Sequence, residues 1–187
     1  YSDADELFEF DDPHDEGLAG LVRRLEAQGA TGLLAQMLEM FPRDALRAWA
    51  QADYAACVAG FDHYDLRDVE SVPYHDRKRV GFWRLLVDNE LPRPDLEIKF
   101  GGVRARVFGE RCCLSKHPLV RIVPGVRPAI HPHCAAGLQL ADQTGLIRHY
   151  KFANDPMRRD GISVAHGVLR HGEDAKRTSA YERDPAL

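Results

Sequence analysis

The chain opens with carboxylates whose spacing suits a metal ion. Asp3 and Asp5 are separated by one residue in the segment YSDADELFEF. Residues i and i+2 of a β-strand point to the same side, so both carboxylates could converge on one cation at the C-terminal end of a strand. Carboxylate oxygens are hard ligands that suit Mg²⁺ or Mn²⁺, and such ions usually also bind substrate phosphates. The alternative for so short a motif is a solvated acidic turn.

Histidines and a cysteine form a second candidate metal site. His131, His133 and Cys134 lie within four residues, and His149 follows in the segment RHYKF. Imidazole and thiolate groups suit tetrahedral Zn²⁺, although this spacing matches no familiar zinc finger. A zinc-dependent hydrolase is therefore one alternative function. The other interpretation of His149 is a hydrogen-bonded structural histidine within a strand.

Basic residues alternate with apolar ones between residues 101 and 127. They are Arg104, Arg106, Lys116, Arg121 and Arg127. Guanidinium groups can clamp a diphosphate through bidentate, charge-assisted hydrogen bonds. The alternative is a sheet with one solvated face.

The composition is that of an ordinary globular protein. The chain has 187 residues, of which 44% are hydrophobic and 29% charged, with a formal net charge of −4. This charge gives no general attraction to nucleic acid, so no nucleic-acid partner is expected. No apolar stretch reaches the length of a transmembrane helix. The four cysteines contain no CxxC pair, which is typical of reduced thiols in a cytosolic protein.

The first half of the chain has the pattern of alternating strands and helices. Apolar residues at helical spacing predict a helix over 15–29, with Asp15 as its cap and Gly29 at its end. Residues 31–41 fit either a helix or a buried strand, and their length and flanking Gly29 and Pro42 favour the strand. Around these segments we expect the end of a buried strand within 1–10, a helix over 43–52 and a loop over 60–78.

The second half has shorter segments. The runs GGVRARVFG (101–109), LVRIV (119–123) and GLIRHYKF (145–152) predict strands. After Asn154 the chain becomes charged, which predicts a terminal helix and a disordered end. The order of these elements indicates an α/β domain whose second half is a mixed sheet.

Four segments together resemble one protein family. DADELFEF, GATGLLAQMLEMFP, GGVRARVFGERCCLSKHPLVR and LQLADQTGLIRHYKF occur in this order. The combination resembles bacterial family-2-like glycosyltransferases of GT-A type, related in pattern to the family 92 enzymes. His117 and the pair Cys112-Cys113 depart from the pattern, but neither lies in the acidic motif.

The resemblance has consequences for fold and domain organisation. It implies that residues 1–155 are the C-terminal part of a GT-A (Rossmann-like) catalytic domain, with a mixed sheet flanked by helices. The nucleotide-binding half would precede residue 1. Residues 156–187 would form a charged tail, partly helical and partly disordered.

The resemblance also implies a reaction. A sugar would pass from a nucleotide-sugar donor to a glycan or lipid-linked acceptor with inversion, in the synthesis of bacterial surface glycans. The expected location is the cytoplasm, with peripheral association at the inner membrane as a variant. The alternative within the same fold is a non-catalytic binding or scaffold domain.

The resemblance implies roles for particular residues. Asp3 and Asp5 would bind Mn²⁺ or Mg²⁺, with His149 as first candidate and His133 as second candidate to complete the metal shell. Deprotonation of the acceptor hydroxyl by a carboxylate is assigned to Asp62, an acidic residue in a loop of suitable position outside the matched segments. The remaining assignments are alternative bases at Asp65 and Asp142 and donor-binding cations at Arg104, Arg106 and Lys116.

Overall fold

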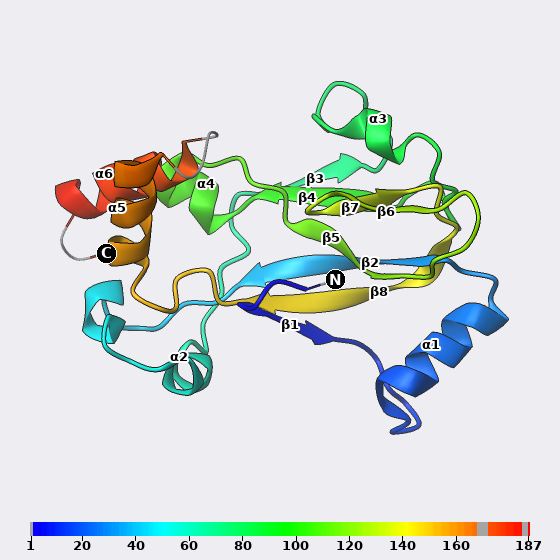
Figure 1. The fold of residues 1–187 in the computed structure, drawn as a ribbon, viewed down its shortest axis with the longest axis horizontal. Helices are drawn as coiled ribbons and strands as arrows, with labels where there is room; N and C mark the ends of the chain where they lie inside the picture. Colours follow the sequence, from blue (N-terminus) through cyan, green and yellow to red (C-terminus); the bar gives the residue numbers. More distant parts are fainter. Residues whose placement is uncertain (1, 168–171, 185–186) are drawn as a thin grey trace. The chain divides into compact units, whose positions relative to one another are not determined.

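A computed structural model describes residues 2–167, 172–184 and 187. The fold is mixed α/β, with a curled mixed sheet flanked by helices, as expected (Figure 1). The chain forms two compact units, each built from three separate segments. The first unit comprises Tyr1–Met37, Glu70–Phe100 and Cys113–Arg148, and the second comprises Leu38–Val69, Gly101–Cys112 and His149–Leu187.

A four-stranded sheet supports the first unit. Its strand order is β1 (Glu6–Glu9), β8 (Leu140–His149), β2 (Gly32–Glu39) and β5 (Ser115–Val120). Strands β2 and β8 run in the same direction in Figure 1, whereas β5 is antiparallel to β2, with Leu33 opposite Leu119. The expected buried strand over 31–41 is confirmed as β2, because six apolar or small residues outweigh its helical propensity once both faces are covered.

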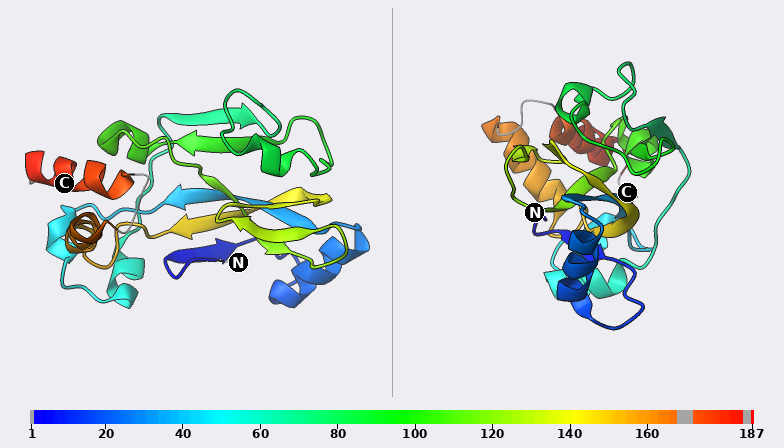
Figure 2. Two further views of the ribbon diagram at one scale, coloured as in Figure 1. Left: turned by 45° about the horizontal axis from the view of Figure 1, so that its top comes forward. Right: turned by 90° about the vertical axis from the view of Figure 1, so that its right-hand side faces the viewer.

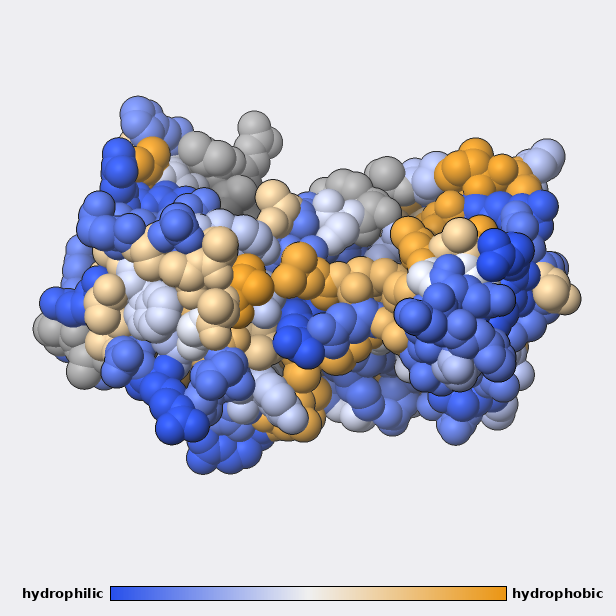
Figure 3. Space-filling model, turned by 90° about the horizontal axis from the view of Figure 1, so that it is seen from below, coloured by the Kyte–Doolittle hydropathy of each residue, from blue (hydrophilic) through white to orange (hydrophobic). Residues whose placement is uncertain are grey.

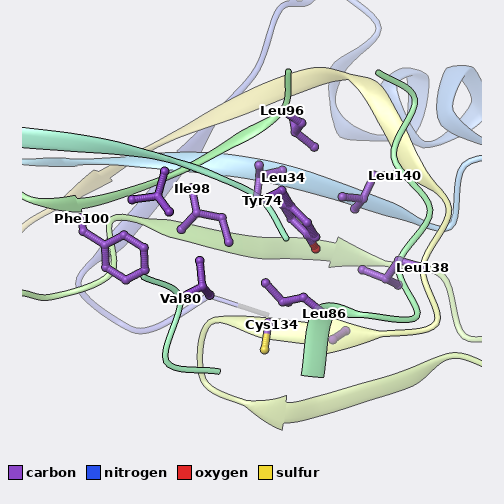
Figure 4. Packing of buried hydrophobic residues seen from close by; sticks show 12 residues of the cluster. Leu34, Tyr74, Val80, Leu86, Leu96, Ile98, Phe100, Cys134, Leu138 and Leu140 are labelled. Atoms are coloured by element: carbon purple, nitrogen blue, oxygen red, sulfur yellow. The ribbon is translucent and has the colours of Figure 1, made fainter. Parts of the chain in front are cut away.

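Two small sheets complete the first unit. Strand β3 (Val69–Pro73) pairs with β4 (Glu97–Gly101), and β6 (Arg127–His131) pairs with β7 (Cys134–Ala136). The connection between β3 and β4 includes the short helix α3 (Trp83–Leu86). The apolar side chains between these elements form one cluster, of which Leu34, Tyr74, Leu86, Ile98 and Leu140 can be followed in Figure 4.

Helix α1 (Gly17–Ala27) confirms the predicted helix over 15–29. Its buried residues Leu21 and Leu25 pack in a second small cluster of the same unit. The cap differs from the expected Asp15: the carboxylate of Asp12 accepts hydrogen bonds from the backbone N–H groups of Glu16 at 3.1 Å and Gly17 at 2.7 Å. Acceptors at this position satisfy N–H groups that have no partner inside the helix.

The second unit is mostly helical. It contains the short helix η1 (Leu46–Trp49) and helices α2 (Tyr54–Gly60), α4 (Val103–Phe108), α5 (Pro156–His166) and α6 (Glu173–Arg183). Its core is rich in stacked aromatic rings: Phe152 lies 5.0 Å from Phe41 and 5.4 Å from Phe108, measured between ring centroids. Side-chain caps begin two helices, with Asp53 accepting from Ala56 N–H and Asp155 from Arg158 N–H.

The prediction of a strand over 101–109 was wrong. Gly101 and Gly102 both have positive φ, at 84° and 66°, and they turn the chain into α4. Gly109, with φ of 68°, ends this helix in the left-handed conformation. Three glycines therefore delimit a single helical segment, and the alternation between them was accidental.

Other boundaries also shifted. The acidic motif precedes strand β1 instead of following a strand, because β1 begins at Glu6. The helix expected over 43–52 is reduced to η1, and the loop expected over 60–78 contains strand β3. The strands expected at 119–123 and 145–152 correspond to β5 and β8, which both begin and end earlier.

The charged C-terminal segment folds as helices α5 and α6, which contact each other and belong to the second unit. Part of the expected disorder falls on residues 168–171 and 185–186, which lie outside the described residues. Among the described helices, none has the length and apolar character needed to cross a lipid bilayer. The views in Figure 2 show α5 and α6 from two further directions.

Large apolar side chains are exposed at several places on the surface. Figure 3 shows one face of the molecule, on which hydrophilic surface surrounds smaller hydrophobic areas. In the first unit, Val22, Leu25 and Leu119 line a cavity of about 150 Å³. Pockets for small organic ligands usually measure about 300–1,000 Å³, so this cavity is too small to argue for one.

Candidate functional site

Lys116 is the centre of a buried ionic cluster in the first unit. Its ammonium group contacts Glu6 Oε2 at 2.7 Å, Glu6 Oε1 at 2.9 Å and Asp3 Oδ2 at 3.0 Å. The side chains of Lys116 and Glu6 are each 1% exposed, whereas that of Asp3 is 46% exposed. The cluster therefore has a buried ion pair at its base and a solvent-accessible carboxylate at its edge.

Glu6 shapes the acidic segment around itself. Its carboxylate also accepts hydrogen bonds from Asp3 N–H at 2.9 Å and from the Ser2 hydroxyl at 3.3 Å. The backbone N–H of Glu6 donates to Asp3 O at 3.2 Å, which closes a tight turn over Asp3-Ala4-Asp5. Asp5 is half-buried in this turn. Asp3 and Asp5 are therefore positioned by a turn and not by the pleat of a strand.

His133 lies beside the same cluster. Its Nδ1 contacts Ser115 O at 3.0 Å, and a carbonyl oxygen can only accept, so Nδ1 carries the proton. Burial lowers the pKa of His133, so the ring is neutral at pH 7 and its Nε2 carries the lone pair. Lys116 and Glu6 are both close enough to act on this imidazole electrostatically. Metal-binding histidines usually donate their second ring N–H to such an acceptor, which fixes the ring.

His149 is positioned differently. It belongs to the second unit, where its Nδ1 lies 3.1 Å from Glu39 Oε1. Burial raises the pKa of Glu39, but the combined effect of His149 and Arg104 is larger and lowers this pKa to about 2. Glu39 is therefore ionised at pH 7. Of the two histidines proposed to complete a metal shell, His133 is bonded to Ser115, the chain neighbour of Lys116, and His149 is paired with Glu39.

Arg104 is buried within a network of carboxylates in the second unit. Its Nε donates to Glu110 Oε2 at 2.7 Å, and its Nη atoms contact Glu39 at 3.4 Å and Glu173 at 3.1 Å. Arg177 extends the network from Glu110 to Asp160 on α5 (2.7 and 2.6 Å). Arg104 was expected to bind a donor diphosphate, but in the structure its guanidinium group forms ion pairs inside the protein.

Arg106 lies at the surface of the second unit. It forms ion pairs with Asp65 and Asp68, and its side chain is 34% exposed. The hydrogen bonds from Arg67 and Arg106 hold the pKa of Asp65 well below its usual range. Asp65, an alternative candidate for the base, is thus engaged in exposed ion pairs.

Asp62 forms a dyad with its neighbour His63. The Asp62 carboxylate accepts a hydrogen bond from His63 Nδ1, and His63 Nε2 accepts one from Arg43 Nε at 2.8 Å. Arginine can only donate, so His63 must carry its proton on Nδ1, facing Asp62. Reciprocal backbone hydrogen bonds between Phe41 and His63 fix this geometry. A carboxylate that orients an imidazole in this tautomer is the arrangement of a general base, and sequence reasoning had found only Asp62.

His117, in the first unit, is buried in a hydrogen-bond network. His117 Nδ1 accepts from Ala135 N–H at 3.1 Å, so neutral His117 carries its proton on Nε2, 3.0 Å from the Tyr74 hydroxyl. Asn89 donates to the same hydroxyl at 2.7 Å. Burial lowers the pKa of His117 to about 4. His117 also lines a cavity of about 370 Å³.

This network predicts acid sensitivity. His117 has an ordinary pKa near 6.5 when unfolded and about 4 when folded, so the unfolded chain binds the proton more tightly. The contribution of neutral His117 to the unfolding free energy is therefore fully present above pH 6.5 and is lost as the pH falls toward 4. We expect His117 to account for a loss of about 2 kcal/mol in unfolding free energy between pH 7 and pH 5.

Urea denaturation at the two pH values measures this loss. His117→Gln should flatten the pH dependence by that amount, while the exposed His14→Gln should retain it. An unchanged pH dependence in His117→Gln would contradict the assignment.

Cys134 does not suit the zinc site expected from the sequence. Burial raises the pKa of the Cys134 thiol to about 11, so the thiolate that zinc prefers is disfavoured at pH 7. His131 Nδ1 is occupied as the acceptor of His133 N–H at 3.1 Å. Within residues 2–167, 172–184 and 187, no group of three or more His, Cys, Asp and Glu side chains is arranged around a common point as metal ligands.

The carboxylates still suit Mg²⁺ or Mn²⁺. Such ions are usually held by one or two protein carboxylates together with substrate phosphates, and not by a complete protein cage. Asp3 and Asp5 supply two carboxylates of this kind, and Asp3 is paired with the Lys116 ammonium at 3.0 Å. Among the described residues, the acidic segment therefore offers carboxylate ligands without a third His, Cys, Asp or Glu ligand at a common point.

No family model, no curated protein and no solved structure matches this chain.

Proposed function

We propose that the chain is the metal-dependent part of a GT-A-type glycosyltransferase, which transfers a sugar from a nucleotide-sugar donor to a hydroxyl acceptor. The observation that carries the proposal is the contact of Lys116 with both Asp3 and Glu6. Asp3 and Lys116 lie far apart in the sequence and are candidates for metal and donor binding. Their contact in one cluster supports a common role.

Each residue of the cluster has a distinct part in this proposal. Asp3 and Asp5 would hold Mn²⁺ or Mg²⁺ through carboxylate oxygens, and His133 would offer its Nε2 lone pair. When bound, the ion would neutralise negative charge on the departing nucleoside diphosphate. Lys116 is too buried to reach a substrate directly, so it would act by holding Asp3 and Glu6 in place. Glu6 in turn fixes the turn that presents the two aspartates.

The acceptor requires a base. Within the second unit, the Asp62–His63 dyad has the geometry of a base: Asp62 orients the ring, and His63 Nε2 carries the lone pair that would take a proton. Arg43 occupies Nε2 in the structure, so this role requires the exposed arginine to move aside. In the proposed reaction, the deprotonated acceptor hydroxyl displaces the nucleoside diphosphate at the anomeric carbon in one step, with inversion.

Nucleotide binding tests the proposal. We expect Mn²⁺-dependent binding of a nucleoside diphosphate, and we expect Asp5→Ala to weaken it by at least about a hundredfold, since even an outer-shell partner of a metal costs about 10–100-fold. Isothermal titration of the 187-residue chain with a panel of nucleoside diphosphates measures this. Asp11→Ala, an exposed carboxylate nearby, is the matched control.

The outcomes separate the alternatives. Binding that survives Asp5→Ala would refute the site assignment. If the chain binds no nucleotide, the non-catalytic scaffold becomes the better interpretation. If it binds, unchanged sugar transfer by His63→Gln would remove the dyad from the reaction and leave the metal site intact.

A further inference from the structure

A strongly basic loop lies between strands β3 and β4 of the first unit. Residues 76–84, with the sequence DRKRVGFWR, contain four cations and one carboxylate, whereas the whole chain has a net charge of −4. Arg77, Lys78, Arg79 and Arg84 are all exposed. Figure 1 shows the segment as a loop that leads into α3. The charge of this loop is thus opposite to that of the molecule.

The single carboxylate of the loop is used to build its turn. Asp76 accepts hydrogen bonds from the backbone N–H groups of Lys78 at 2.8 Å and Arg79 at 3.0 Å, and from Arg79 Nε at 2.8 Å. Arg79 therefore neutralises Asp76. Arg77, Lys78 and Arg84 keep their charge on the surface.

An aromatic ring lies among these cations. The guanidinium carbons of Arg77 and Arg84 lie 4.9 and 5.8 Å from the centre of the Trp83 ring, within cation–π range. One turn further along, Val87 is 49% exposed. The neighbouring Val80 and Leu86 are completely buried in the core, so the loop has a rigid base. Exposed cations, the half-buried Trp83 and the exposed Val87 thus follow one another within residues 77–87.

We propose that this loop is a docking surface for a lipid bilayer that contains anionic phospholipids. Basic side chains are attracted to anionic headgroups, and tryptophan favours the interface between headgroups and acyl chains. Exposed Val87 would gain contact with acyl chains, a gain that the phosphate backbone of a nucleic acid does not offer. The inference depends on this loop alone and is independent of the proposed function.

Vesicle sedimentation with the full chain tests the inference. We expect the protein to sediment with phosphatidylcholine vesicles only when phosphatidylglycerol is included, and to be released at high salt. Arg77→Glu with Lys78→Glu should lower the partition coefficient at least about tenfold. Arg23→Glu with Arg158→Glu reverses two exposed charges outside the loop and should leave partitioning unchanged.

Tryptophan fluorescence provides a second measurement. The chain has two tryptophans, so Trp49→Phe leaves Trp83 as the only one. Its emission should shift to shorter wavelength when anionic vesicles are added. Equal binding to neutral vesicles, or partitioning that is unaffected by the Arg77 and Lys78 reversals, would overturn the inference. Binding to single-stranded DNA as strong as to vesicles, without an emission shift on vesicles, would overturn it in favour of a polyanion site.

Discussion

Replacing Arg177 by methionine is expected to lower the free energy of unfolding by about 3–5 kcal/mol. The Arg177 side chain is 1% exposed and contacts Asp160 at 2.6 Å and Glu110 at 2.7 Å. Methionine would leave the buried Asp160 carboxylate without its main cation and would remove one of the two arginines on Glu110. An uncompensated buried charge costs far more than the net value of the pair that held it.

Urea denaturation of the purified variant measures this loss. Arg183→Met, on the exposed face of the same helix, should change stability by less than about 0.5 kcal/mol. Combining Arg177→Met with Asp160→Leu removes both charges and should recover part of the loss. A loss below about 1 kcal/mol in Arg177→Met, or a double variant less stable than the two single losses together predict, would show that the network is not held in this way.

Replacing Lys116 by methionine is the second change with a large expected effect, again about 3–5 kcal/mol. Glu6 would keep two hydrogen bonds, from Asp3 N–H and the Ser2 hydroxyl, but it would lose the only cation that the structure gives it among the described residues. Its buried carboxylate would then have to ionise without a counter-charge or take up a proton.

The companion variant separates charge from packing. Glu6→Gln with Lys116→Met leaves no buried charge, so it should be more stable than Lys116→Met alone. The exposed Lys78→Met, in the same unit, should be nearly neutral. If the single and double variants are equally stable, the cost of Lys116→Met lies in packing and not in the ion pair.

The Lys116 variants also inform the proposed function. Lys116 positions Asp3 and Glu6 without reaching the substrate, so the double variant should fold yet bind Mn²⁺ and nucleotide less tightly than the native chain. Its unfolding curve and its binding isotherm, measured on the same sample, distinguish a positioning role from a purely structural one.

The sequence alone determined the elements whose signal is local. Helical spacing of Leu18, Leu21 and Leu25 was sufficient for α1, and a dense apolar run between Gly29 and Pro42 was sufficient for β2. Such elements are visible in the sequence because the spacing of apolar residues shows directly which side of the segment is buried. The acidic motif at residues 3–5 was likewise visible as a candidate ligand set.

Local patterns failed where the backbone and not the side chains decided the structure. The alternation in GGVRARVFG resembled a strand, but Gly101, Gly102 and Gly109 all adopt positive φ and delimit α4. Glycine pairs carry this freedom without indicating whether it is used. A helix of only six residues also has too little periodicity to be recognised.

The roles of the charged residues were decided by the tertiary structure. Arg104 and Arg106 are two residues apart with the same chemistry, yet Arg104 is buried among carboxylates and Arg106 is paired at the surface. Lys116 meets a carboxylate 110 positions away in the sequence. A charge can be buried only where partners from distant segments compensate its desolvation, and no local pattern records where those partners will be. The sequence therefore identified which side chains could do chemistry, and the fold determined which of them meet.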